Sequence, residues 1–254
     1  MVGALATGAI QVDWLSNIVT AVALVAAIYL WVQMYTSKLV TREEKNRLLG
    51  FIPMFVSGVL FFGIFQQQFT VMTIYSDVRL DRHMFGWEIP PSLVQSINPI
   101  FIVIFSAVFA TMWTKLGDRQ WSTPVKFGVA NIVIGISLFF FLPYSGAAAN
   151  STPMYVIILI LFLFTMAELL LSPVGNALAT KVAPVAFPSR MMAVWMMAVA
   201  MGTSLAGSLA SFYNPDDAGA ENTFFISLGV VSIVLGAILL VLSRWVVKKF
   251  STFR

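Results

Sequence analysis

The stretch LFLFTMAELLLSPVGNALATKV, residues 161–182, has the length and apolar character of a membrane-spanning helix. It nevertheless holds one acid, Glu168, which is followed by Ser172 and Pro173. A carboxylate at the centre of a bilayer costs about 2.5–3.5 kcal/mol even on insertion scales, so such a group usually faces a protein interior or a water-filled cavity. The stretch therefore predicts a membrane helix whose acid belongs to a functional site.

The composition of the whole chain indicates an integral membrane protein. Of its 254 residues, 59% are hydrophobic and only 10% are charged, whereas a soluble domain has about 25% charged residues. Long apolar runs without alternation favour helices over a β-barrel. Seven stretches are long enough to cross a bilayer, namely 14–37, 49–76, 92–114, 124–143, 153–178, 191–213 and 222–247. The sequence thus predicts an all-α protein with seven transmembrane helices.

Lysine and arginine are distributed unevenly over the loops between these spans. All but Arg79 and Arg82 lie in residues 38–49, 115–126 and 181–190 or in the C-terminal tail. Because positively charged loops face the cytoplasm, we expect the C-terminus to be cytoplasmic and residues 1–13 to lie outside. The expected location is the plasma (inner) membrane, with several crossings. This bias also explains the pI of about 9.5, so no nucleic-acid partner is expected.

Several kinds of chemistry are excluded by the residue types. The chain has no cysteine and a single histidine, His83, which leaves no thiolate nucleophile, disulfide or zinc site. Phosphate-binding glycine loops, paired metal-binding acids and a Ser-His-Asp set at membrane depth are also missing from the sequence. Residues 1–10 lack the basic segment and long apolar core of a signal peptide. We therefore expect neither an enzyme nor a metal site, and no cleaved leader.

Polar residues inside the predicted spans are the remaining candidates for function. No lysine or arginine lies deep in a span, so Glu168 is either protonated or paired with a ligand, water or another polypeptide. Gln66, Gln67 and Gln68 are consecutive and cannot all face one direction on a helix. Each of them either faces a cavity or holds two helices together by a hydrogen bond.

Two prolines and a tryptophan leave similar alternatives open. Asn98 precedes a proline that weakens the helix ladder, so its side chain either enters a cavity or bonds the loosened backbone. Pro173 and Gly175 predict a gating hinge beside Glu168, or else a static kink. Trp195 either belongs to the aromatic belt at the membrane surface or forms the wall of a pocket.

Four segments together resemble the proton-dependent oligopeptide transporters, a branch of the major facilitator superfamily. They are AELLLSPVGNALATKVAP at 167–184, QSINPIF at 95–101, KLGDRQWSTPVKF at 115–127 and RMMAVW at 190–195. The first is similar to the glutamate-leucine and serine-proline-valine-glycine signature of the family's tenth helix. Their order and spacing also match the family.

The resemblance covers only the second half of such a transporter. Residues 49–254 correspond to helices seven to twelve, the C-terminal six-helix bundle. Residues 1–48 then hold a linker helix and a cytoplasmic loop. The family's first-half motif, ExxERFxxY, is absent from this sequence.

The resemblance implies roles for individual residues. Glu168 is similar to the glutamate that binds the amino terminus of the peptide, and Asn98 to the asparagine beside it. Trp195 matches a tryptophan of the pocket wall, and Ser172 lies within the same signature as Glu168. In the seventh helix the family commonly has a glutamate-glutamine pair associated with proton coupling, where this chain has Gln66 and Gln67.

The resemblance implies a proton-coupled symporter of di- and tripeptides, with the proton as coupling ion and no other cofactor. Its expected partners are the peptide, the lipid bilayer and an N-terminal transporter half, without which we expect no active transport. Because glutamine does not titrate, the usual proton site is in doubt. The alternative is a non-transporting membrane scaffold or the remnant of a split transporter gene, in which Glu168 is a protonated structural residue.

Overall fold

The computed structural model describes residues 12–84 and 86–250. Residues 1–11, which the charge pattern places outside, are not among them. The elements are α2 (Val12–Thr36), α3 (Arg42–Phe65), η1 (Gln66–Phe69), α4 (Val71–Val78), β1 (His83–Met84), β2 (Trp87–Glu88), α5 (Pro91–Val94), α6 (Ile97–Leu116), η2 (Gly117–Arg119), α7 (Thr123–Leu138), η3 (Phe139–Tyr144), α8 (Met154–Val182), α9 (Pro188–Ala210) and α10 (Ala218–Phe250).

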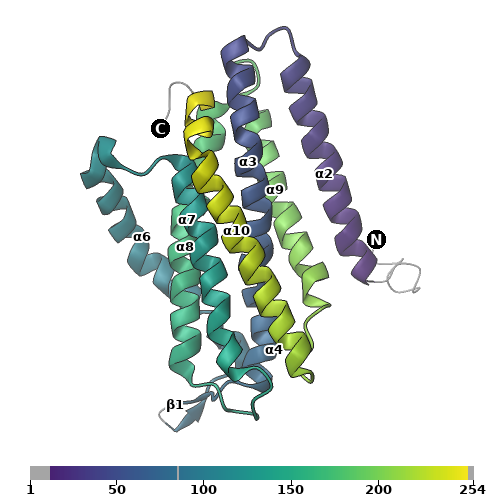
Figure 1. The fold of residues 1–254 in the computed structure, drawn as a ribbon, viewed down its shortest axis with the longest axis vertical. Coiled ribbons are helices and arrows are strands. Elements are labelled where there is room, and N and C mark those ends of the chain that lie inside the picture. The colour runs from purple at the N-terminus through teal and green to yellow at the C-terminus, as the bar shows by residue number, and fades with distance from the viewer. Residues whose placement is uncertain (1–11, 85, 251–254) are drawn as a thin grey trace.

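The described part of the chain has seven spans that are long and apolar enough to cross a membrane, which confirms the predicted number. Figure 1 shows them side by side along one direction, with α2 at one side of the bundle and α6 at the other. The β1–β2 hairpin is short and lies beyond the helices at one end. The fold is therefore the expected all-α membrane bundle.

Three of the spans are not continuous α-helices, which differs from the prediction. The fourth span passes from α7 into the 3-10 helix η3 at Phe139. The second span passes through the 3-10 helix η1 at the three glutamines before α4 begins. The third span is interrupted at Gln95 and Ser96, between α5 and α6. Pro99 consequently lies in the first turn of α6 rather than inside a helix, where its missing N–H costs little.

The second span also begins earlier than predicted, at Arg42 instead of residue 49. Thr41 caps this helix: the Glu44 backbone N–H donates to the Thr41 hydroxyl at 3.3 Å, and the Thr41 backbone N–H donates to the Glu44 carboxylate at 2.8 Å. This reciprocal capping box satisfies two free donors of the first turn. As a result, Lys45 and Arg47 lie on α3 and not in a loop.

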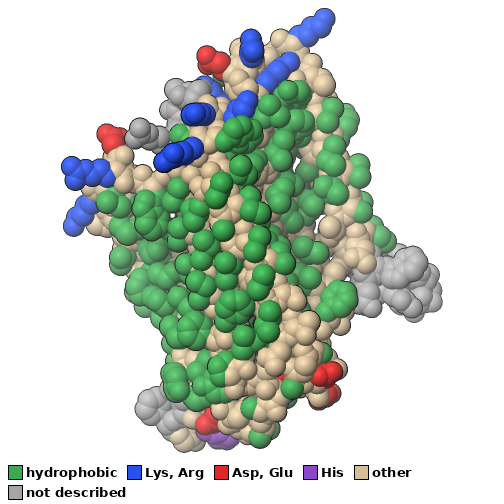
Figure 2. Space-filling model, viewed as in Figure 1, with side chains coloured by type: hydrophobic (Ala, Val, Ile, Leu, Met, Phe, Trp, Pro, Cys, Tyr) green, Lys and Arg blue, Asp and Glu red, His purple; other side chains and the backbone are tan. Residues whose placement is uncertain are grey.

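Charged side chains gather at the two ends of the bundle. Figure 2 shows lysine and arginine at the end where α2 connects to α3, and an apolar body below it. We call this end, formed by residues 36–42, 117–123 and 182–188 and the end of α10, the basic end. The opposite end carries the hairpin and residues 144–154 and 210–218, and we call it the acidic end. The two kinds of charge are thus segregated, and which end faces the cytoplasm stays a prediction.

A buried ion pair closes the acidic end. The Glu221 carboxylate is 0% exposed and accepts hydrogen bonds from Arg79 at 3.1 Å, from the Gly146 backbone N–H at 3.0 Å and from the Tyr213 hydroxyl at 2.9 Å. Arg79 also donates to backbone carbonyls of both neighbouring loops. A buried charge is tolerated only when its hydrogen bonds are made, and here they tie three segments together.

Glycines allow α7 and α10 to approach very closely. A β-carbon added at Gly135 would lie 2.7 Å from the carbonyl oxygen of Gly229, and one added at Gly236 would lie 2.6 Å from that of Gly128. On each helix the two glycines are seven residues apart, so they lie on one face. Such stretches of small residues let helix backbones pack directly in membranes.

We predict that Gly135→Ala destabilises the bundle. The added β-carbon meets a backbone oxygen that cannot move independently, and overpacking of this kind typically costs about 1–3 kcal/mol. Gly63→Ala is the matched control, because the nearest atom to its β-carbon is a leucine methyl carbon at 3.5 Å. The unfolding temperature of purified protein should fall for Gly135→Ala and stay near wild type for Gly63→Ala. Equal effects of the two substitutions would contradict this account of the α7–α10 contact.

Candidate functional site

Glu168 lies on α8, where the structure leaves its carboxylate incompletely paired. The residue is partly exposed, but its Oε2 atom is buried and has no hydrogen-bond partner among the described residues. The side chain of Asn98, from α6, interacts with the same carboxyl group. A buried unpaired carboxylate oxygen is costly unless a ligand, water or proton satisfies it. The geometry therefore makes this position a candidate binding site.

Asn98 is held against α8 by a second contact. Its side chain is 3% exposed and donates from Nδ2 to the hydroxyl of Thr165 at 3.0 Å. Thr165 lies three residues before Glu168 and itself donates to the carbonyl of Leu161 at 2.8 Å. Asn98 thus bonds across to α8 and not back to its own loosened backbone. The structure brings Asn98 and Glu168 together, as expected.

A polar stripe continues from Glu168 along α8 toward the basic end. Ser172, Asn176 and Thr180 follow at intervals of four residues, which places them on one face of the helix. Ser172 is partly exposed, while Asn176 and Thr180 are exposed. The sequence prediction included Ser172 but missed Thr165, which lies three residues before Glu168, and Asn176, which lies four residues after Ser172.

Trp195 is a core residue of this bundle. Its side chain is 1% exposed, and the rings of Phe51, Phe62 and Phe127 surround it with centroids 5.9–6.3 Å away. Such burial does not agree with a position in an aromatic belt. The indole Nε1–H donates to Asn176 Oδ1 at 2.9 Å, which connects α9 to the polar stripe. The tryptophan thus packs against α8 and holds Asn176 of the polar stripe in place.

The predicted hinge segment lies within a continuous helix. Helix α8 runs from Met154 to Val182 through both Pro173 and Gly175. A β-carbon at Gly175 would lie only 2.1 Å from the Trp195 ring, so this glycine makes room for the tryptophan. The packing explains why position 175 needs a glycine, and the gating role of Pro173 and Gly175 stays a prediction.

The three glutamines differ in their surroundings. Gln66 is partly exposed and donates to Thr203 of α9 at 3.1 Å. Gln67 is buried and donates to the carbonyl of Ala206 at 3.2 Å and to its own helix at 3.1 Å. Gln68 is also buried, and its amide atoms have no hydrogen-bond partner among the described residues. Gln67 therefore fits the helix-joining alternative, and none of these bonds links the glutamines to Glu168.

A cleft separates α6 from α8 toward the basic end. The two helices pack together near Phe101, Phe105 and Phe162, whose rings lie 5.3–6.1 Å apart. Beyond this contact α6 diverges from the bundle, as Figure 1 shows. The space of about 940 Å³ is lined by residues that include Pro173 and Lys181. The proline of α8 therefore faces open space and not a neighbouring helix.

Comparison with known proteins gives a consistent result. The model of the POT family matches residues 6–226. The chain is 36% identical to a di-/tripeptide transporter of Lactococcus lactis subsp. cremoris over 246 residues, which is 94% of this chain and 48% of that protein. It is also 36% identical over 239 residues to an uncharacterized transporter of Bacillus subtilis, covering 93% of this chain and 48% of the relative.

Among solved structures, the chain is similar to the crystal structure of a peptide transporter in complex with sulfate. The TM-score is 0.87 at 32% sequence identity, and the match covers 97% of this chain and 50% of the other. The chain thus spans about half the length of the relatives that it matches.

We predict that Gly175→Ala destabilises the protein through Trp195. The new β-carbon would meet an indole that three phenylalanine rings hold in place. Trp195→Phe removes the part of the ring that causes this clash. Thermal unfolding of the two single variants and the double variant should show that Gly175→Ala costs less stability in the Trp195→Phe background. Additive effects would show that the two residues do not share this contact.

Proposed function

The chain belongs to the POT family, and we propose that it forms the C-terminal half of a proton-coupled di/tripeptide symporter, supplying one wall of a central peptide site. The name of the Lactococcus relative supports peptide as the substrate class. The seven apolar spans support a function within the membrane. The proposal assigns the wall of the site to α8 and its neighbours.

The observation that carries this proposal is the unpaired carboxylate oxygen of Glu168 beside Asn98. The amino terminus of a peptide is a cation, and its attraction to a carboxylate is several times stronger in a medium of low dielectric constant than in water. Asn98 is positioned by Thr165 and can supplement this contact with its amide. Protonation of Glu168 would remove the negative charge and weaken the attraction.

The second wall of the site comes, in this proposal, from an N-terminal transporter half, in the same polypeptide or in another. Alternating access moves two helical bundles about a shared site near the middle of the membrane. In this proposal the protein lies in the plasma membrane, and its basic end faces the cytoplasm. Bending of α8 at Pro173 and Gly175 then changes the width of the α6–α8 cleft on the cytoplasmic side.

Positions 66 and 67 cannot carry the coupling proton in this chain, because both are glutamines and glutamine does not titrate. Gln67 uses its amide to join α3 and α9, so its contribution is structural. Gln66 keeps one exposed side and can contact a peptide near Thr203. The proton is then carried by Glu168 or by a group in the other half.

We predict that Glu168→Gln weakens peptide binding at least tenfold. The substitution keeps the size of the side chain but removes the charge, and hydrogen bonds to charged groups contribute about 1.5–3 kcal/mol. Binding of dialanine to the purified protein can be measured by calorimetry or by ligand-induced thermal shift. Glu88→Gln, an exposed acid of the β2 strand, is the control and should bind as wild type does. Dialanine binding that is unchanged by Glu168→Gln would contradict the site, and no binding by any variant favours the scaffold alternative.

We also predict that this chain, reconstituted alone in liposomes, does not accumulate dialanine when a proton gradient is imposed. One bundle offers only one wall of the site, so it cannot alternate access between the two sides. Reconstitution together with an N-terminal half from a POT family member should restore uptake. Gradient-driven uptake by the single chain would show that a second half is not required.

A further inference from the structure

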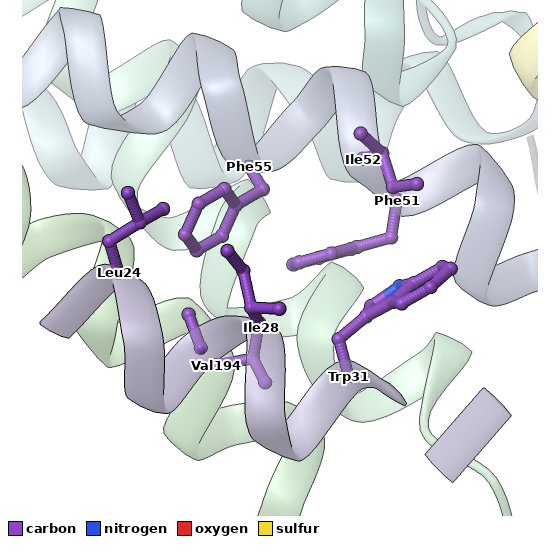
Figure 3. Close-up of a pocket in the computed structure, with 8 residues that line it drawn as sticks. Leu24, Ile28, Trp31, Phe51, Ile52, Phe55 and Val194 are labelled. Carbon is purple, nitrogen blue, oxygen red and sulfur yellow. The ribbon is translucent and has the colours of Figure 1, made fainter. Parts of the chain in front are cut away.

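A second candidate binding site lies on a different side of α9 from the polar stripe. It is an apolar groove between α2, α3 and α9, shown in Figure 3 and lined by residues that include Leu24, Ile28, Trp31, Phe51, Phe55 and Val194. Its volume is about 190 Å³, and no polar atom contributes to its surface. A peptide or another polar ligand would find no hydrogen-bond partner in it.

The groove exists because α2 packs along α9 and not along α3. Toward the acidic end, Ser204 of α9 donates to the carbonyl of Ser16 at 2.6 Å. Toward the basic end, Arg190 donates to Gln33 at 2.7 Å, and the Trp31 indole donates to the carbonyl of Leu48 on α3 at 3.3 Å. Between these attachments α2 packs mainly on α9, which leaves a space beside α3.

The rim of the groove is open to the membrane. Leu24 and Ile28 are 41% and 53% exposed, and both belong to a span whose exposed residues face lipid. Trp31 closes the groove five residues before α2 ends at Thr36, which is about 8 Å along the helix axis. The groove therefore lies in the leaflet next to the basic end. The apolar molecules available at this depth are the acyl chains of that leaflet.

Positive charge lies directly above the groove. Tyr35 stacks on Trp31 with ring centroids 4.9 Å apart, and the Lys45 ammonium lies 5.9 Å from the centre of the Tyr35 ring. Lys45 forms no salt bridge with any carboxylate in residues 12–84 and 86–250. The neighbouring Glu44 is occupied by Thr41 and by the backbone N–H of Val185. The apolar groove thus leads through two stacked rings to an unneutralised cation.

We propose that this groove binds one acyl chain of an anionic phospholipid, whose phosphate is held by Lys45. The chain fills the space between α2 and α3 that the protein leaves empty, and the phosphate supplies the negative charge that Lys45 lacks. The lipid then joins α2 to the six-helix bundle. This site does not depend on the proposed peptide transport and shares no side chain with Glu168 or Asn98.

The test is native mass spectrometry of the purified full chain, titrated with phosphatidylglycerol and with phosphatidylcholine of identical acyl chains. Wild type should bind one phosphatidylglycerol more tightly than phosphatidylcholine. Lys45→Gln should weaken phosphatidylglycerol binding about fivefold, the effect of one lysine near an anionic surface. It should weaken phosphatidylcholine binding less, because the choline cation offsets the charge of that lipid's phosphate. Ile28→Trp should fill the groove and weaken the binding of both lipids.

Matched controls lie on α10, away from the groove. Lys248→Gln removes another exposed cation of the basic end, and Ile238→Trp enlarges another exposed apolar residue. Both should bind phosphatidylglycerol as wild type does. Leu24→Trp, on the rim, replaces Ile28→Trp if that variant fails to fold. Equal losses of phosphatidylglycerol binding in the groove and control variants would overturn the proposal. Lipid-free dimers in which a second copy of the chain covers the groove would also overturn it.

Discussion

The structure depends on how carboxylates inside the bundle are paired, and Glu221 and Glu168 show opposite solutions. Glu221 accepts hydrogen bonds from Arg79, Gly146 and Tyr213, so its charge is compensated and it holds the acidic end together. Glu168 keeps one buried oxygen without a partner. A paired carboxylate stabilises a fold, whereas an unpaired one stays expensive until something binds to it. The difference between the two acids, and not the presence of an acid in a membrane helix, supports the proposal that Glu168 binds a cationic group.

The rest of the bundle is arranged as a rigid frame with one open side. Glycines bring α7 against α10, and Gly202 of α9 brings that helix within reach of Val59 on α3, where an added β-carbon would lie 2.7 Å from a carbonyl oxygen. Contacts of this kind leave little freedom for relative movement. Helices α6 and α8, in contrast, meet at three phenylalanines and then separate around the cleft that Pro173 lines. The frame therefore fixes Trp195, while the cleft leaves α6 and the basic half of α8 with space to move.

Much of the fold could be predicted from the sequence, because a helix that crosses the bilayer has to be apolar over about 20 residues. The seven spans, the segregation of charge and the exceptional position of Glu168 follow from counting apolar and charged residues. The start of α3 was also readable, since Thr41 and Glu44 have the spacing of a capping box, but the positive charges around them favoured a loop. Contacts between distant segments were beyond reach: Arg79 and Glu221 are 142 residues apart, and their pairing follows only from the fold. The same is true of Gln67, because the face of a helix that turns inward is decided by its neighbours. The contact between Asn98 and Glu168 was expected from the family resemblance and not from the residues themselves.

Helix α9 links the two candidate sites, since neighbouring residues on it serve different sides. Val194 lines the apolar groove beneath α2, and Trp195 points into the core and donates to Asn176 on the polar stripe. Both side chains are almost fully buried, so neither can change its surroundings unless α9 moves. A displacement of α9 that alters the support of the stripe would therefore also alter the width of the groove. In the proposed transporter, a lipid held beside Val194 would act on the same helix that supports the proposed peptide wall. The membrane leaflet and the substrate would then influence one another through a single packed element, with no direct contact between them.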